Sequence, residues 1–477
     1  MNIVLVTDKP RANAVEYFCI AHGGRLVALV NLTDQPYENQ HITSYTISDI
    51  PRIGHDLVIV DCHDAPFVIS QIKNYKTAEI YDYWPNRHKL LGLLKQSNLL
   101  CKRKFEVEND RLLVGTEFYS CDHKVIEDIP SSNTDDLQSQ TIDEIYEAYN
   151  QACLKYPDLD EKYQTGENWR NFMKGSRPNF YSAIQRSDKE ALSDLLSNFF
   201  RNELTGGTFG GKEGYDGFCA SGNEVVELRS YFNVWKQCVP DTPIQELNNP
   251  PVGNPYGVSV EGALLNSNNF CNHYRSIFLS RLFSDIDNPV IAELGAGFGG
   301  LAYYLSKNNT DITYINFDLP ENLMVSSYYL KSIFPDKKIK LYDGSSAPIS
   351  REELQEYDLV LLPHFCLPRL TKLSIDLFIN TISLSEMDFL NIETYFEEVQ
   401  RVTRQYFYHE NMLDNGAGYK YFPTSVFPEL ADYKLLMNAP SRWPAFSLSS
   451  PGHCHMEFLY QRNNGPTNKN TTIGDNL

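Results

Sequence analysis

The sequence predicts an α/β fold in which parallel strands alternate with helices. The strongest observation is the stretch 290–300, VIAELGAGFGG, in which a short apolar run meets an acid and then four glycines. A strand, a glycine turn and a helix in succession bring backbone N–H groups close to a nucleotide-like ligand. Two further observations agree: strand-like and helical runs alternate after residue 300, and a similar rhythm opens the chain. This alternation is typical of a doubly wound, Rossmann-like sheet.

The bulk composition excludes several classes of protein. A net charge of -19 and a pI of about 5.0 argue against a nucleic-acid partner, because such proteins need a basic surface. The chain lacks an apolar run long enough for a membrane span, and its first residues lack the basic segment of a secretory signal. The 10 cysteines include no Cys-x-x-Cys pair. We therefore expect a cytoplasmic protein, with a homo-oligomer left open.

Residues 1–130 are predicted to form a small α/β domain of their own. Strand-like apolar runs occur at residues 3–6, 26–30 and 57–60. Residues 12–22 have a helical pattern, and the first turn, from Thr7 to Pro10, contains no glycine. The glycine turn that usually lets a phosphate approach the backbone is therefore missing. We interpret this domain as a scaffold or oligomerisation unit, with a substrate-recognition module as the alternative.

Residues 131–250 are predicted to be a helical insert that follows a polar linker at 130–136. Apolar residues recur at three- and four-residue spacing between 141 and 204, which indicates helices. The glycine-rich segment 205–214, TGGTFGGKEG, fails as a P-loop because no Gly-Lys-Ser/Thr follows a strand. We interpret it as a mobile loop that covers the substrate, with a simple linker as the alternative.

Residues 251–462 form the third predicted domain, and the Asn-, Thr- and Gly-rich tail 463–477 is predicted to be disordered. A helical pattern at 269–283 leads into the glycine stretch. Candidates for contact with a ligand or substrate before that stretch are Tyr256, His273, Tyr274 and Arg275. In an open parallel sheet, ligands lie beyond the carboxyl ends of the strands. Strands predicted at 312–317, 338–342 and 357–362 are followed by Asp318, by Asp343 and Gly344, and by His364.

Two ligand classes fit the glycine stretch. As Gly295-x-Gly297-x-x-Gly300 it matches a dinucleotide fingerprint, with Asp318 at a suitable distance for a ribose hydroxyl. As Glu293-x-Gly295-x-Gly297-x-Gly299 it matches the loop of S-adenosyl-L-methionine-dependent methyltransferases. Glu293 discriminates between them, because a pyrophosphate disfavours a nearby carboxylate. S-adenosylmethionine has no phosphate and carries two cationic groups, so the same carboxylate is favourable.

Four motifs carry a resemblance to a known family. They are ELGAGFGG at 293–300, FDLP at 317–320, PHF at 363–365 and NTISLSEM at 380–387. With these motifs, residues 250–460 resemble the sugar O-methyltransferases of bacterial surface-polysaccharide and sugar-modifying clusters. The resemblance implies a class I methyltransferase domain, S-adenosylmethionine as cofactor and a sugar or glycan as substrate.

The resemblance also implies roles for particular residues. The methionine end of the cofactor would be lined by Glu293, Gly295, Ala296, Gly297 and Gly299. Asp318 would accept hydrogen bonds from both ribose hydroxyls, because a carboxylate has two acceptor oxygens. Leu319 would flank the adenine, and Asp343, followed by Gly344, would bond the adenine amine.

Methyl transfer to a hydroxyl needs a base for the alcohol proton, and histidine is the side chain best matched to neutral pH. His364 is the first candidate for this base, and His409 is the second. Glu386 would orient the base or hold a sugar hydroxyl. Hard oxygen ligands for a divalent metal are present in Glu386, Asp388, Glu410 and Asn411, but no spacing specifies a metal site. The rival interpretations are a nicotinamide-dependent oxidoreductase and a non-catalytic assembly protein with this fold.

Overall fold

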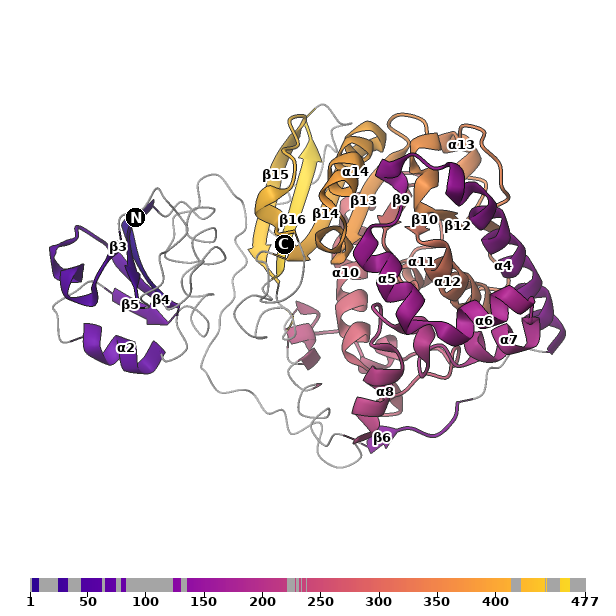
Figure 1. Ribbon diagram of the computed structural model, residues 1–477, viewed down its shortest axis with the longest axis horizontal. Helices are drawn as coiled ribbons and strands as arrows, with labels where there is room; N and C mark the ends of the chain where they lie inside the picture. Colours follow the sequence, from indigo (N-terminus) through magenta and orange to yellow (C-terminus); the bar gives the residue numbers. More distant parts are fainter. Residues whose placement is uncertain are drawn as a thin grey trace.

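The computed structural model describes most of the chain from residue 135 onward and separate parts before it (Figure 1). The described residues are 2–7, 25–32, 44–61, 65–73, 79–82, 123–129, 135–220, 228, 231–232, 234–236, 238–412, 422–441, 443 and 455–463. The helix predicted at 12–22 lies outside them, as does the predicted tail from residue 464 onward. Among these residues, strands form sheets of five, eight and three strands.

The eight-stranded sheet is the centre of the larger unit, and its order is β11-β12-β10-β9-β13-β14-β16-β15. Its strands are β9 (Val290–Leu294), β10 (Thr313–Asp318), β11 (Ile339–Leu341), β12 (Leu359–Pro363), β13 (Ile375–Thr381), β14 (Thr403–Met412), β15 (Tyr433–Pro440) and β16 (His455–Arg462). Neighbours from β11 to β14 are parallel, whereas β16 runs antiparallel to both β14 and β15. The predicted Rossmann-like sheet is therefore confirmed for this domain.

Strand β9 lies at the point where the strand order reverses. The chain passes from β9 to β10 on one side and later returns to β13 on the other side. Ligands of open α/β sheets bind at such a switch point. The strand predicted at 338–342 is β11, but it lies at the sheet edge because β12 enters between β10 and β11. Alternation along a sequence predicts strands, but it does not fix their lateral order.

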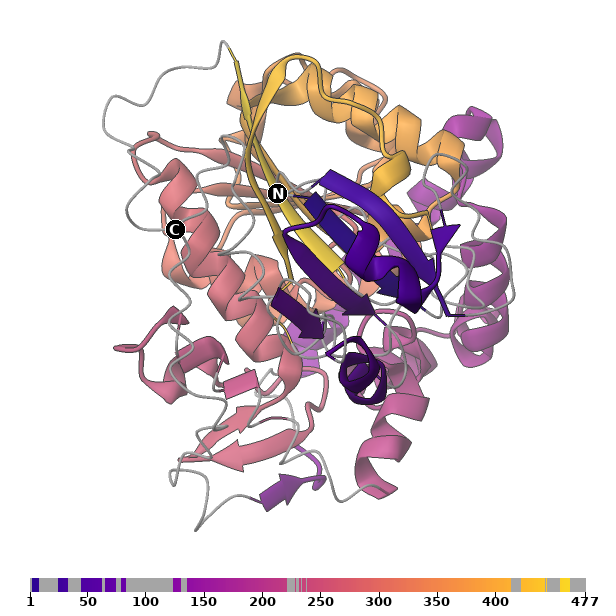
Figure 2. The same cartoon turned by 90° about the vertical axis from the view of Figure 1, so that its left-hand side faces the viewer.

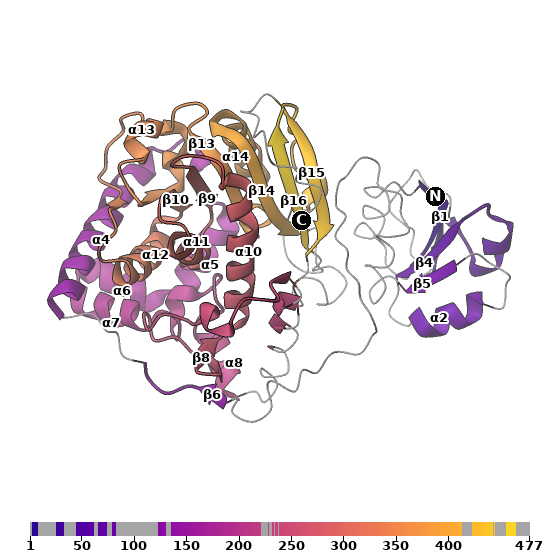
Figure 3. The same cartoon turned by 180° about the vertical axis from the view of Figure 1, so that it is seen from behind.

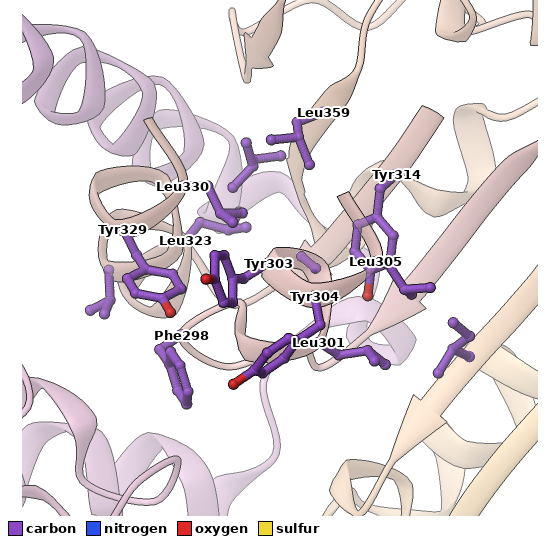
Figure 4. Close-up of a cluster of buried hydrophobic side chains, with 14 of the residues drawn as sticks. Phe298, Leu301, Tyr303, Tyr304, Leu305, Tyr314, Leu323, Tyr329, Leu330 and Leu359 are labelled. Atoms are coloured by element: carbon purple, nitrogen blue, oxygen red, sulfur yellow. The ribbon is translucent and has the colours of Figure 1, made fainter. Parts of the chain in front are cut away.

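Helices cover both faces of this sheet (Figures 1 and 3). They are α10 (Ser267–Phe283), α11 (Gly300–Asn308), α12 (Pro320–Ile333), α13 (Arg351–Leu354) and α14 (Phe389–Val402). One face packs against α10, α11 and α12 through an aromatic core, part of which Figure 4 shows with Tyr303, Tyr304 and Tyr329. The other face packs against α14, whose Ile392 and Phe396 recur at helical spacing.

The segment predicted as a helical insert is rich in helices. It contains α4 (Asp135–Lys155), α5 (Glu167–Ser176), α6 (Pro178–Arg186), α7 (Lys189–Ser197) and α8 (Gly211–Ala220). Helix α4 packs against α12 of the larger unit. The predicted linker at 130–136 differs at its end, because Asp135 and Asp136 begin α4. Acidic side chains stabilise the first turn of a helix through its dipole, so this part of the polar run is helical.

Two smaller sheets complete the described structure. The N-terminal sheet is parallel, with the order β3-β2-β1-β4-β5 (Figure 2). Its elements are β1 (Asn2–Thr7), β2 (Arg25–Asn31), β3 (Ser44–Tyr45), β4 (Leu57–Asp61), β5 (Glu79–Asp82) and α2 (Ala65–Ile72). The three-stranded antiparallel sheet consists of β6 (His123–Val125), β7 (Gly257–Val260) and β8 (Ala263–Leu265). The three strands of the N-terminal domain that the sequence predicts are thus present as β1, β2 and β4.

Short 3-10 helices join these elements. They are η1 (Ile47–Arg52), η3 (Tyr156–Asp158), η4 (Glu161–Tyr163), η5 (Glu203–Thr205), η6 (Ile244–Leu247), η7 (His364–Arg369), η8 (Ser383–Glu386) and η9 (Thr424–Val426). Two of them matter for the site, because η7 follows β12 and η8 lies just beyond β13. Both therefore begin at the carboxyl edge of the large sheet.

Candidate functional site

A cavity opens at the carboxyl ends of β9, β10, β12 and β13. Its empty volume is about 1160 Å³ when the solvent at its mouth is counted. The insert contributes part of the wall with Gln164, Thr165, Gly166, Trp169, Gly207 and Thr208. The glycine-rich segment predicted to cover a ligand therefore reaches the cavity through Gly207 and Thr208.

The glycine loop forms the floor of the cavity beside β9. Gly295 has a φ of 78°, and a Cβ there would clash with the hydroxyl of Ser383. A glycine at this position lets η8 pack directly against the loop. Gly299, a predicted cofactor contact, is not among the residues that line the cavity. It is the residue directly before α11, with a φ of 91°, and it faces Leu330, while Gly300 lines the cavity.

Two backbone N–H groups of the loop donate hydrogen bonds inward. The N–H of Gly295 donates to the carbonyl of Phe317 at 2.7 Å, and the N–H of Gly297 donates to Oδ2 of Asp318 at 2.7 Å. The loop is thereby tied to the end of β10. Because both N–H groups already donate within the protein, they are not available to bind a phosphate group.

Asp318 lies at the cavity wall and is held in place from several sides. Its Oδ1 accepts from the N–H of Leu319 at 2.7 Å and from the amide of Asn322 at 2.9 Å. The orientation of the Asn322 amide is fixed in turn by Arg177, whose Nη2 donates to Oδ1 of Asn322 at 2.9 Å. Burial raises the pKa of Asp318 to about 6, and these hydrogen bonds oppose the rise.

Glu293 presents a buried carboxylate at the end of β9, where only 2% of the residue is exposed. The hydroxyl of Tyr314 donates to its Oε2, and the hydroxyl of Thr381 donates to its Oε1 at 3.3 Å. Burial raises the pKa of Glu293 to about 7, while the hydrogen bond from Tyr314 and the charge of Arg275 lower it. The carboxylate is therefore poised to ionise fully when a cation arrives beside it.

The motif at 380–387 shapes the turn after β13. Ile382 has a φ of 74° and its N–H donates to the carbonyl of Glu410 at 2.6 Å. The amide of Asn380 donates to the carbonyl of Leu294 at 2.8 Å and to the hydroxyl of Ser383 at 2.6 Å. A non-glycine residue at positive φ is costly and persists where its surroundings impose it. These contacts point the end of β13 toward the glycine loop.

Glu386 and His364 are the two titratable groups of the predicted catalytic set that line the cavity. Burial raises the pKa of Glu386 to about 7, and a hydrogen bond from Trp169 of the insert lowers it. His364 follows β12, and its Nδ1 lies 2.7 Å from the hydroxyl of Tyr395. Burial lowers the pKa of His364 to about 4, and its Nε2 is buried without a partner among the described residues.

Arg275, which lines the cavity, forms a buried ion pair with Glu410. Nη2 and Nε of Arg275 donate to Oε2 of Glu410 at 2.6 and 3.1 Å. The hydroxyl of Ser441 donates to Oε1 at 2.6 Å. Of the predicted substrate contacts on α10, Arg275 alone lines this cavity.

Several other predicted site residues lie elsewhere. His409 points to the opposite sheet face, where it is stacked on Phe458, so it is not placed to act as the base. Its neighbour on β14, Glu410, points to the face of α10, because side chains alternate along a strand. His273 accepts a hydrogen bond from the indole of Trp235, and Tyr274 packs against Trp443.

Asp343 and Gly344, the predicted contacts of the adenine, are also not among the residues that line the cavity. They follow β11, and β12 separates that strand from β10. A Cβ on Gly344 would meet the side chain of Gln151 on α4. Tyr256 lines a second, neighbouring cavity. Glu293, Gly295, Ala296, Gly297, Asp318 and Leu319 do line the first one.

In the part of the chain that the structure describes, no group of three or more His, Cys, Asp and Glu side chains is arranged to hold a metal ion. Of the oxygen ligands considered from the sequence, Glu410 is bound by Arg275, and Asn411 donates to Oδ1 of Asn380 at 2.8 Å. No helix among the described residues is long and apolar enough to cross a membrane.

Several residues that line the cavity were not predicted from the sequence. Asn268 and Asn272 precede Arg275 by seven and three residues, so all three share one face of α10. That spacing is a signal that the sequence does contain. Trp169 and Tyr395 carry no such signal, because packing of the insert and of α14 brings them to the site.

Comparisons with known proteins give structural similarity only. No protein-family model matches the chain, and no curated protein matches it. A similar solved structure is a SAM-dependent methyltransferase from Aquifex aeolicus, with 12% identity, a TM-score of 0.27 and coverage of 39% of this chain and 89% of that one. Another is geranyl diphosphate methyltransferase in complex with GPP and sinefungin, with 10% identity, a TM-score of 0.28 and coverage of 39% and 76%. A third is the N-terminal domain of EvdMO1 in the presence of SAH and D-fucose, with 12% identity, a TM-score of 0.24 and coverage of 40% and 82%.

Proposed function

We propose that the chain is an S-adenosylmethionine-dependent O-methyltransferase that acts on a sugar hydroxyl. The observation that carries the proposal is the buried carboxylate of Glu293, which lines the cavity beside the glycine loop. A carboxylate there favours a ligand with a cation next to the loop, as the ammonium group of S-adenosylmethionine provides. When bound, this cofactor supplies a methyl group activated by a sulfonium centre.

The residues of the cavity fit such a cofactor from end to end. Glu293 would hold the ammonium group, and Asp318 would accept a hydrogen bond from the ribose. Three acceptor positions of Asp318 are already used by Gly297, Leu319 and Asn322, which leaves room for about one ribose hydroxyl. His364 follows β12, whose last residue pairs with Asp318, and Tyr395 of α14 lies within hydrogen-bond distance of His364. Both side chains would border the adenine. In this arrangement His364 would lie away from the methyl group.

The rival is a nicotinamide-dependent oxidoreductase, and three observations disfavour it. A pyrophosphate needs N–H donors, yet those of Gly295 and Gly297 donate within the protein. It would also lie close to the carboxylate of Glu293, which repels it. The cavity also has few cations, because Arg275 is the one arginine or lysine among the described residues that line it.

We assign the general base to Glu386. The proton of an alcohol must leave as its oxygen attacks, and a base works best when its pKa is near the working pH. The pKa of Glu386 is raised to about 7 by burial, whereas burial lowers that of His364 to about 4. A carboxylate oxygen of Glu386 would accept the proton of the sugar hydroxyl.

The sugar as acceptor is supported by the amide groups of the cavity and by the motif at 380–387. Asn268, Asn272 and Asn391 line the cavity. Nδ2 of Asn391 donates to the carbonyls of Lys162 and Gln164, and Oδ1 of Asn272 accepts from Arg275. The amide of Asn268, Nδ2 of Asn272 and Oδ1 of Asn391 would thus supply donors and acceptors to hydroxyl groups. This balance of donors and acceptors suits a polyhydroxylated substrate better than a charged one.

Isothermal titration of the full chain tests the cofactor directly. S-adenosylmethionine and S-adenosylhomocysteine should both bind, and NAD and NADP should not. Binding of a dinucleotide in the absence of S-adenosylmethionine binding would contradict the proposal. A non-catalytic assembly protein would bind the cofactor but transfer no labelled methyl group to any glycan of a lysate of the cells that make it.

A further inference from the structure

A second cavity lies beside the first, between α8 and the start of α10. Its empty volume is about 710 Å³ with the solvent at its mouth included. The rings of Phe209, Phe218 and Tyr256 line it. Tyr256 is buried, and its ring centroid lies 5.6 Å from that of Phe209 and 5.0 Å from that of Phe218. The cavity therefore has an aromatic wall of three rings.

The two cavities meet at α10. Asn268 lines both of them, while Thr208 lines the first and the adjacent Phe209 lines the second. Asn272 and Arg275 continue the lining of the first cavity on the same face of the helix. A stripe of polar side chains thus leads from the aromatic wall toward the carboxyl end of β9.

We propose that the second cavity holds a neighbouring sugar ring of the acceptor, so that the substrate is an oligosaccharide or the end of a glycan. This inference rests on the proposed function and names its substrate class. A sugar ring places its apolar C–H face against an aromatic ring and its hydroxyls against amides. Phe209, Phe218 and Tyr256 supply the first kind of contact, and Asn268 supplies the second.

The same lining argues against a nucleotide-linked sugar. A diphosphate requires cations or unused N–H donors. Among the described residues that line either cavity, Arg275 is the one cation, and it is paired with Glu410. At the start of α10, the N–H of Asn268 already donates to the side chain of Asn266. The surroundings thus suit an uncharged ring.

A variant that fills the second cavity tests the inference without weakening the fold. Gly214 lies on α8 and lines the cavity, and a Cβ there would make ordinary contacts with Phe209 and the hydroxyl of Tyr256. Leucine is a better helix former than glycine, so Gly214→Leu keeps α8 intact. The matched control is Lys212→Ala, which removes an exposed side chain paired with Asp216 on the same helix.

The assay uses the full chain, S-adenosylmethionine with a labelled methyl group, and a panel of monosaccharides, their di- and trisaccharides, and nucleotide-linked sugars. Label should enter the di- and trisaccharides at least tenfold more efficiently, as kcat/KM, than the matching monosaccharides. Gly214→Leu should abolish this preference and leave the Kd for S-adenosylmethionine within twofold. Lys212→Ala should change neither quantity.

Each outcome decides for or against the inference. Equal labelling of monosaccharides, preferred labelling of nucleotide-linked sugars, or an unchanged preference in Gly214→Leu would overturn it. Cofactor binding without label on any oligosaccharide would also overturn it, while leaving the proposed cofactor intact. Failure of S-adenosylmethionine to bind would instead contradict the proposed function itself.

Discussion

The hydroxyl of Tyr314 on β10 donates a hydrogen bond to the carboxylate of Glu293 on the neighbouring strand β9. Both side chains are fully or almost fully buried, so the carboxylate loses most of its hydration. The hydrogen bond from Tyr314 stabilises the ionised form and so partly offsets the lost hydration. This pair brings a partly ionised acid to the glycine loop at neutral pH, and cofactor binding should depend on it.

Glu293→Gln should weaken the binding of S-adenosylmethionine by about 10- to 100-fold, since a charge-assisted hydrogen bond contributes about 1.5–3 kcal/mol. In the wild type, affinity should rise as the pH passes through about 7, because Glu293 then ionises. Titration calorimetry from pH 6 to 8.5 measures both effects. Glu352→Gln, which alters a carboxylate on α13, is the control, and equal affinity of the two variants would contradict the role of Glu293.

The same carboxylate should reduce the stability of the protein without ligand. The folded pKa of Glu293 is raised to about 7 from 4.5, so the folded state binds more protons than the unfolded state between these values. Below about pH 4.5 Glu293 is protonated in both states and its burial carries no charge penalty. As the pH rises to about 7, the free energy of unfolding falls, because the unfolded state loses the proton first. Glu293→Gln should raise the Tm more at pH 8 than at pH 5, with a free-energy gain of up to roughly 3 kcal/mol. A similar change in Tm at both values would show that the carboxyl is not desolvated as the structure indicates.

The base assignment predicts a pH profile. If Glu386 accepts the proton, kcat should rise with pH and level off above about 7. Glu386→Gln should lower kcat by about 10²- to 10⁴-fold and leave the Kd of the cofactor nearly unchanged. His364→Ala is the contrasting variant. Loss of turnover in His364→Ala, with turnover retained in Glu386→Gln, would return the role to the histidine.

The ion pair between Arg275 and Glu410 predicts a large effect on stability. Removing one partner of a buried pair leaves the other charge unpaired, which costs about 3–5 kcal/mol. Glu410→Gln should therefore lower the free energy of unfolding in urea by about that amount. The exposed pair of Lys189 and Asp143 provides the control, because Asp143→Asn should cost less than about 1 kcal/mol. Equal costs at the two sites would mean that Arg275 finds another partner.

Much of the larger unit could be predicted because its signals are local. Apolar runs between polar turns predict β9, β10, β12 and β14, and the glycine spacing places a ligand loop after β9. Glu293, Gly295, Gly297 and Asp318 line the cavity because strand ends of a parallel sheet meet at one edge. These predictions needed only the order of elements along the chain.

Other features depend on contacts that the sequence does not display. The insertion of β12 between β10 and β11 moves Asp343 away from the cavity and brings His364 to it. The side-chain alternation of β14 turns His409 away and turns Glu410 toward Arg275. Both outcomes follow from lateral strand order and register, which are set by packing between distant segments.

The strand, the glycine loop and the acid of the candidate cofactor site could be predicted from the sequence, because neighbouring residues along one strand and turn create them. Tertiary structure decided which other side chains join that site. Trp169 of the insert reaches Glu386, and Arg177 of the insert fixes Asn322 beside Asp318. Such contacts join residues far apart in the chain, and their formation depends on burial and packing that no local pattern records.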